Sequence, residues 1–94
     1  MSIDEDPENH EWAALAAAGV SFASRRVLEI GAGDGRLTER YAGTAGSVIA
    51  IDSDADAIAE LRAALPAVDA RAIGIEALRL PAQSVDLVLF AWSL

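Results

Sequence analysis

The amino-acid sequence predicts an α/β fold in which helices flank a parallel β-sheet. Short apolar runs that favour strands alternate with segments that favour helices, the order produced when strands are joined through crossover helices. The runs are apolar at nearly every position, so both faces of the sheet need cover. A glycine-rich turn follows the first run. In an open parallel sheet such a turn lies beyond the carboxyl ends of the strands, where ligands bind.

The chain begins with an acidic segment, residues 1–9, which we expect to be mobile, and residues 10–94 are expected to form one partial domain. An alanine-rich stretch over about residues 10–20 favours a helix, because alanine loses no side-chain entropy on entering one. Gly19 and Ser21 mark its expected end.

Four apolar runs define the predicted sheet, and two further helices are expected between them. The first of these helices, from Gly35 to about residue 42, places Leu37 and Tyr41 four positions apart on one face. The second extends to about Leu65, where Pro66 ends it, and the acidic residues at its start suit the exposed amide groups there. The predicted strands cover residues 27–30, 47–51, 70–73 and 85–90, with an irregular stretch over 74–84.

Composition limits the classes of partner. Fifteen acidic residues against seven basic ones, all arginine, give a net charge of −8, which repels phosphate backbones and disfavours direct nucleic-acid binding. Without cysteine the chain has no disulfides or thiolate metal ligands, and no metal site is predicted. The first residues lack the basic and apolar regions of a secretory signal, and no apolar run approaches the roughly 20 residues of a membrane span. We therefore expect a soluble, cytoplasmic protein with no membrane partner.

The glycine-rich turn has the sequence EIGAGDG and lies directly between the first strand and the helix after it. Its three glycines, at alternate positions, remove side chains where a ligand can approach the backbone. The dinucleotide spacing G-x-G-x-x-G requires glycine or alanine where this chain has Arg36, whose side chain would obstruct close helix–strand packing. Asp34 inside the turn and Glu29 before it are poor neighbours for a pyrophosphate. A ligand with an ammonium group and no phosphate fits better, and a flexible turn without a ligand is the alternative.

The run VLEIGAGDGRLT, residues 27–38, resembles the first motif of class I S-adenosylmethionine-dependent methyltransferases. The resemblance implies a Rossmann-like, seven-stranded sheet, of which about four strands can be counted here, and S-adenosyl-L-methionine as cofactor. It also implies that Glu29 helps to hold the amino group of the cofactor, whereas without a ligand Glu29 would cap the strand end in solvent. The turn residues that would wrap the methionine part are Gly31, Ala32, Gly33 and Gly35.

Asp52 follows the second strand, about 20 residues beyond the glycine turn, at the spacing of an acid that binds ribose hydroxyls. A carboxylate can accept hydrogen bonds from both hydroxyls of one ribose. The resemblance implies this role for Asp52, with Ser53 beside it in the cofactor site. The alternative is an ordinary N-cap of the next helix, a role that Asp54 or Asp56 could equally fill.

The segment GIEALRLP, residues 74–81, followed by SVDLVL, resembles the adenine-binding part of the same family. The resemblance implies that Glu76, where the family more often has aspartate, accepts a hydrogen bond from the adenine amino group. It further implies that the backbone amide of Glu76 or Ala77 meets a ring nitrogen. Asp86, at the start of the fourth strand, is expected to be structural.

Taken together, these motifs resemble those of enzymes that transfer the methyl group of S-adenosyl-L-methionine to an acceptor, and the resemblance implies that activity. Family members that methylate amino groups of nucleic acids or glutamine often carry an Asn/Asp-Pro-Pro-aromatic tetrad after the fourth strand, which this chain lacks, and this favours a small-molecule acceptor. No catalytic residue is identified, since the single histidine, His10, is expected to be a solvated residue at a helix start. Two alternatives stay open: a non-catalytic or degenerate cofactor-binding fragment and, less favoured, an NAD-dependent oxidoreductase.

The last predicted strand begins with Val85 and ends with Phe90. In the full fold of the family it is an interior strand, but here it would form an exposed apolar edge. Such edges recruit other strands. We therefore expect that this 94-residue segment alone is marginally stable, that it self-associates through residues 85–90, or that it belongs to a longer chain.

Overall fold

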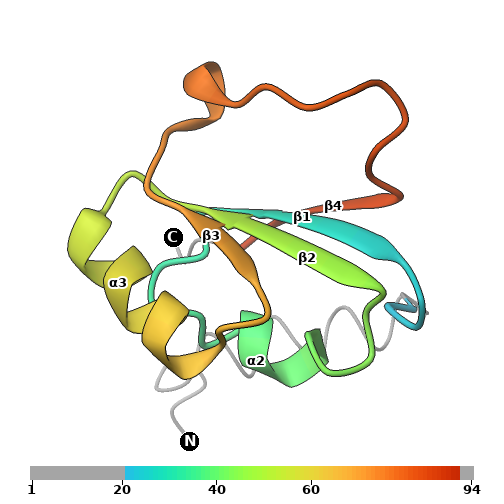
Figure 1. The fold of residues 1–94 in the computed structure, drawn as a ribbon, viewed down its shortest axis with the longest axis horizontal. Helices are drawn as coiled ribbons and strands as arrows, with labels where there is room; N and C mark the ends of the chain where they lie inside the picture. Colours follow the sequence, from blue (N-terminus) through green and yellow to red (C-terminus); the bar gives the residue numbers. More distant parts are fainter. Residues whose placement is uncertain (1–20, 92–94) are drawn as a thin grey trace, which may run out of the picture.

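The computed structural model describes residues 21–91 and shows a parallel sheet of four strands in the order β3-β2-β1-β4 (Figure 1). The strands are β1 (Arg26–Ile30), β2 (Ser47–Ile51), β3 (Asp69–Arg71) and β4 (Leu87–Phe90). The predicted α/β class and the parallel sheet are confirmed. The acidic segment over 1–9 and the helix predicted over 10–20 lie outside the described residues.

The register of the sheet places the carboxyl ends of all four strands at one edge. Ile30, the last residue of β1, lies opposite Ile51 of β2 and Phe90 of β4. Ile51 in turn lies opposite Arg71, the last residue of β3. The segments that leave β1 and β2 are therefore neighbours, as expected for the ligand-binding edge of an open parallel sheet.

Both α-helices of the described region, α2 (Thr38–Tyr41) and α3 (Ala55–Ala64), lie below the sheet in Figure 1. Because side chains alternate along a strand, β1 presents Val27 and Glu29 to these helices. Val27 belongs to a buried cluster with Tyr41 of α2 and Leu61 of α3. Above the sheet runs the connection from β3 to β4, which contains the 3₁₀ helix η1 (Ile75–Ala77). No helix among residues 21–91 is long and apolar enough to cross a membrane.

The helix α3 starts where the acidic sequence predicted. The Asp54 carboxylate accepts hydrogen bonds from the backbone N–H groups of Asp56 and Ala57, both at 3.1 Å, and so caps the helix. Ile58 and Leu61 are fully buried on its inner face. Since Asp54 is the N-cap, the carboxylate of Asp52 is not the cap of this helix.

Three predicted boundaries were wrong by a few residues. The helix predicted from Gly35 begins only at Thr38, because Gly35 has a φ of 93°, which is incompatible with a helix. The strand predicted over 70–73 is Asp69–Arg71, because β2 ends at Ile51 and offers no pairing partner beyond Arg71. The strand predicted over 85–90 begins at Leu87. The residue before it, Asp86, is bound to Arg26 through both its backbone and its carboxylate.

Candidate ligand-binding site

All three glycines of the turn have left-handed backbone conformations, with φ of 78° at Gly31, 58° at Gly33 and 93° at Gly35. L-residues with a Cβ adopt this region at a cost, so the turn depends on glycine. At Gly35 a Cβ would also lie 2.9 Å from Cγ of Leu61, so this position lets the turn pack on α3. At Gly33 a Cβ would meet nothing within 4 Å. The turn therefore has one glycine that packs inward and one that borders open space.

Asp52 connects this turn to the start of α3. Its Oδ2 accepts a hydrogen bond from the backbone N–H of Gly33 at 2.9 Å, and its Oδ1 accepts one from the N–H of Asp54 at 2.8 Å. The turn is also fixed to the end of β2, because the N–H groups of Gly31 and Ala32 donate to the carbonyl of Ile51. The structure thus brings the predicted turn and the predicted acid into direct contact.

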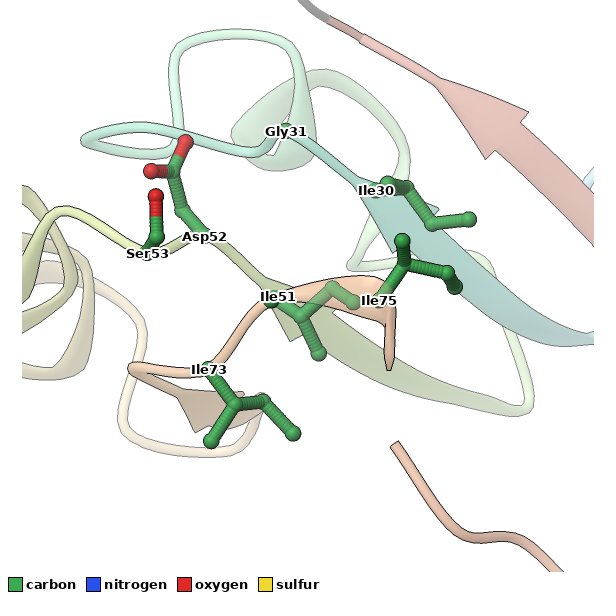
Figure 2. A pocket seen from close by; sticks show the side chains of 8 residues that line it. Ile30, Gly31, Ile51, Asp52, Ser53, Ile73 and Ile75 are labelled. Atoms are coloured by element: carbon green, nitrogen blue, oxygen red, sulfur yellow. The ribbon is translucent and has the colours of Figure 1, made fainter. Parts of the chain in front are cut away.

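A cavity of about 170 Å³ lies at the carboxyl ends of β1 and β2 (Figure 2). Figure 2 shows the Asp52 carboxylate and the Ser53 hydroxyl on one side of it and isoleucine side chains on the other. The cavity therefore has a polar part beside an apolar part. Its lining residues are Ile30, Gly31, Ile51, Asp52, Ser53, Ile73, Gly74 and Ile75.

Five of these lining residues were not predicted as site residues. Ile30 and Ile51 are the last residues of β1 and β2, so the rule that ligands bind at the carboxyl ends of parallel strands would have found them. Gly74 and Ile75 lie in the stretch predicted to be irregular, and Ile73 was predicted as the end of a strand that in fact ends at Arg71, so no sequence pattern fixed the path of the backbone here. Among them, Ile75 is 51% exposed, so part of its apolar side chain is open to a ligand.

Glu76 and Ala77 lie in η1, next to this cavity but not in its lining. The carboxylate of Glu76 folds back over Gly74, so closely that a Cβ at Gly74 would collide with it. The backbone N–H of Ala77 donates to the carbonyl of Gly74 at 3.1 Å. The two residues are thus exposed beside the apolar part of the cavity, and Glu76 lies against Gly74, which is one of the lining residues.

Glu29 is placed away from solvent and outside the cavity lining. Its side chain is fully buried on the helix face of β1, which excludes the role of a strand cap in solvent. Its Oε1 accepts hydrogen bonds from the hydroxyl of Thr38 at 2.8 Å and from that of Tyr41 at 2.5 Å. Burial, reinforced by the Glu29 carboxylate, raises the pKa of the Tyr41 hydroxyl well above its usual value, so this hydroxyl remains protonated and donates.

Known proteins that match this chain in sequence are named as methyltransferases. The sequence model of a methyltransferase domain matches residues 27–94. An uncharacterized methyltransferase of Mycobacterium tuberculosis is 41% identical over 85 residues, 90% of this chain and 32% of the relative. A probable S-adenosylmethionine-dependent methyltransferase of Mycolicibacterium smegmatis is 42% identical over 67 residues, 71% of this chain and 26% of the relative. The chain thus spans about a third or less of the length of these curated relatives.

Solved structures agree with the sequence matches. An S-adenosylmethionine-dependent methyltransferase from Mesorhizobium loti superposes with a TM-score of 0.75 at 28% identity, covering 85% of this chain and 38% of that one. Phosphoethanolamine N-methyltransferase 1 of Haemonchus contortus, in complex with phosphoethanolamine and S-adenosylhomocysteine, gives a TM-score of 0.79 at 26% identity, over 94% of this chain and 20% of that one. By its motifs, its sheet and these matches, the chain belongs to the class I S-adenosylmethionine-dependent methyltransferase family.

Proposed function

We propose that this chain forms the S-adenosyl-L-methionine-binding part of an enzyme that methylates a small molecule. The observation that carries the proposal is the divided cavity beside the glycine turn. A nucleoside has the same division, since its sugar is rich in hydroxyls and its base has apolar faces. Family membership supports the choice of cofactor.

Asp52 is assigned to the ribose hydroxyls. An ionised carboxylate offers about four acceptor positions, two on each oxygen. The backbone N–H groups of Gly33 and Asp54 occupy one position on each oxygen of Asp52. One position on each oxygen is thus left for a ribose hydroxyl, and the hydroxyl of Ser53 lies on the same side of the cavity (Figure 2).

The adenine base is assigned to the apolar part of the cavity. Ile51, Ile73 and Ile75 line this part, so that ring faces would replace water on these side chains. Burying the half-exposed Ile75 side chain under the base gives its position a purpose. Glu76, beside this part, is assigned to the adenine amino group, with the backbone amide of Glu76 or Ala77 toward a ring nitrogen.

The methionine end of the cofactor is assigned to the glycine turn, formed by Gly31, Ala32, Gly33 and Gly35. The open space at Gly33 allows the ligand to approach the backbone there. Glu29, buried beneath the turn and outside the cavity lining, is assigned to the amino group through the turn that it supports. With these assignments the sulfonium group of S-adenosyl-L-methionine would lie near the end of β4, where the methyl acceptor would approach.

In methyl transfer a lone pair of the acceptor attacks the methyl carbon, the carbon–sulfur bond breaks, and S-adenosylhomocysteine leaves with the electron pair. Catalysis of this displacement rests mainly on holding the acceptor in line with the carbon–sulfur bond and on excluding water. A small acceptor is supported by the net charge of −8, which disfavours nucleic acid, and by the structural similarity to an enzyme named for phosphoethanolamine. No residue of the chain is assigned to proton transfer.

Calorimetric titration of the product of the whole reading frame with S-adenosylhomocysteine and with NAD tests the proposal. The protein is expected to bind S-adenosylhomocysteine and not NAD, and the reverse would assign a nicotinamide enzyme instead.

Asp52→Ala should lower the affinity for S-adenosylhomocysteine by tenfold or more, since two hydrogen bonds to a charged group are lost. Asp54→Ala is the matched control, because it removes the neighbouring carboxylate, which caps α3 and does not line the cavity. A methyl-release assay then separates an enzyme from a protein that binds the cofactor without transferring its methyl group.

A further inference from the structure

Three polar side chains form a buried cluster beneath the glycine turn. Glu29 lies in β1, which leads into the turn, whereas Thr38 and Tyr41 lie in α2, which follows it. All three are buried, and both hydroxyls donate to the same oxygen of Glu29. The cluster therefore joins the two ends of the turn by hydrogen bonds that bypass the turn itself.

The two hydroxyl donors are held firmly in place. Thr38 and Tyr41 are three residues apart and so lie on the same face of α2. The ring of Tyr41 stacks on that of Phe22 with 4.4 Å between ring centroids and 17° between the ring planes. Because burial and the Glu29 carboxylate raise the pKa of Tyr41, its hydroxyl keeps its proton near neutral pH and can donate to Glu29.

Packing alone does not account for this cluster. Enclosing a carboxylate in an apolar core is costly, and hydrogen bonds only partly offset the cost, so apolar residues of similar size would stabilise the same fold at least as well. Tyr41 belongs to the cluster of apolar side chains under the sheet, and Glu29 and Thr38, which are hydrogen-bonded to each other, are fully buried. A role that apolar residues cannot fill is therefore indicated: fixing the direction of the Glu29 carboxylate and the distance between β1 and α2.

We propose that Thr38 and Tyr41 are positioning residues that act through Glu29 on the amino-acid end of the cofactor. This inference rests on the proposed function, in which Glu29 and the glycine turn receive that end of the ligand. Loss of either hydroxyl leaves the cavity formed by Asp52 and the isoleucines unchanged. The nucleoside part of the ligand is therefore bound as before, while the amino-acid part meets a turn whose two ends are held less firmly.

Two ligands separate these parts. S-adenosylhomocysteine carries the amino-acid tail, and 5′-methylthioadenosine has the same nucleoside without it. In the product of the whole reading frame, Tyr41→Phe and Thr38→Val each remove one donor at nearly constant volume. We expect each variant to bind S-adenosylhomocysteine roughly tenfold more weakly, because the turn that receives the amino-acid tail is then less preorganised. The affinity for 5′-methylthioadenosine should stay within about twofold of that of the unchanged protein.

Two further variants guard against a purely structural explanation. Thr38→Ser keeps the hydroxyl that Thr38→Val removes, and it should bind S-adenosylhomocysteine about as tightly as the unchanged protein. This comparison at position 38 remains a test even if Tyr41→Phe fails to fold. Thr44→Val removes a hydroxyl that donates to the backbone carbonyl of Tyr41 at 3.0 Å and not to Glu29, and should leave the ratio of the two affinities unchanged.

The outcomes are distinct. An equal loss of affinity for both ligands in Thr38→Val, or no loss for either, would overturn the positioning role while leaving the proposed function intact. Failure of the unchanged protein to bind either ligand would instead overturn the proposed function and the inference with it.

Discussion

The backbone N–H of Gly33 donates a hydrogen bond to Oδ2 of Asp52 at 2.9 Å and so ties the glycine turn to the end of β2. The two residues are 19 positions apart, and this bond joins the segment assigned to the methionine part with the residue assigned to the ribose. Asp52 thus shapes the site even before a ligand binds. A change at Asp52 should therefore be felt in the turn as well as in the affinity for cofactor.

Asp52→Ala removes this acceptor, and the Gly33 amide should then exchange with solvent faster, by about tenfold for a bond worth ~1–1.5 kcal/mol. Hydrogen exchange followed by NMR measures this directly. In Asp54→Ala the amides of Asp56 and Ala57 lose their acceptor, while protection at Gly33 should persist. Unchanged exchange at Gly33 in Asp52→Ala would show that other contacts hold the turn.

Gly33→Ala and Gly35→Ala should differ in stability although both positions have positive φ. A left-handed alanine costs about 1–2 kcal/mol at either position. At Gly35 the new methyl group also meets Leu61, which adds roughly 1–3 kcal/mol of overpacking. Urea unfolding of the two variants should show Gly35→Ala as the less stable.

The two alanine variants should also separate folding from binding. Gly33→Ala places its methyl group in the open space assigned to the ligand, so it should lose affinity for S-adenosylhomocysteine while remaining folded. Equal stability of the two variants would contradict the packing role of Gly35, and unchanged affinity in Gly33→Ala would contradict the place given to the ligand.

The sequence predicted the sheet well because its evidence was local. Apolar runs bounded by glycine or acidic residues located β1 and β2 to within a residue, and the alternation of elements indicated parallel pairing. A helix was predicted where α2 lies, but its start was placed at Gly35 rather than Thr38, because nothing in the sequence shows that Gly35 takes a positive φ. Element ends set by pairing across the sheet, such as Arg71 opposite Ile51, were likewise invisible to a local pattern.

The residues that line the cavity were predicted only in part, again because the evidence in the sequence is local. Gly31, Asp52 and Ser53 line the cavity, since motif spacing places them at strand ends. Ile73 and Ile75 could not be found, because their place depends on how an irregular segment returns over the sheet. The partnership of Glu29 with Thr38 and Tyr41 depends on the packing of α2 on β1, which sequence spacing alone does not give.

Arg26 and Asp86 should make stability depend on pH in the acid range. The Arg26 guanidinium donates two hydrogen bonds to the Asp86 carboxylate, at 3.0 and 2.9 Å, and its backbone N–H donates a third. These bonds, helped by the charge of Arg26, hold the pKa of Asp86 well below its usual range. A carboxyl group whose pKa is lowered by folding stabilises the fold above its unfolded pKa of about 3.9 and loses that contribution as pH falls further.

The measurement compares the melting temperature of the unchanged protein with that of Asp86→Asn from pH 7 down to pH 2.5. The variant should melt at a lower temperature near neutral pH, and the difference should shrink below about pH 4, where the unfolded chain takes up a proton on Asp86 that the folded chain does not. The pair is exposed to solvent, so the difference should also fall as salt is added. A difference that is constant over this pH range would show that Asp86 acts through its size or its backbone bond alone.

The 94-residue chain should self-associate through β4. Within residues 21–91, β4 is the last strand of the sheet on its side, and Val88 and Phe90 are 47% and 60% exposed. An apolar strand at a sheet edge is a template for pairing with another chain. We therefore expect the sedimentation coefficient of the chain to rise with concentration over the micromolar range.

Val88→Lys should suppress this rise, because a charge on the exposed side of an edge strand disfavours pairing. Ile75→Lys is the matched control, since it places the same charge on an equally exposed isoleucine outside the sheet and should leave association unchanged. A chain that sediments as a monomer at all concentrations would rule out this interface, and equal suppression by both lysine variants would point to general apolar contact rather than pairing at β4.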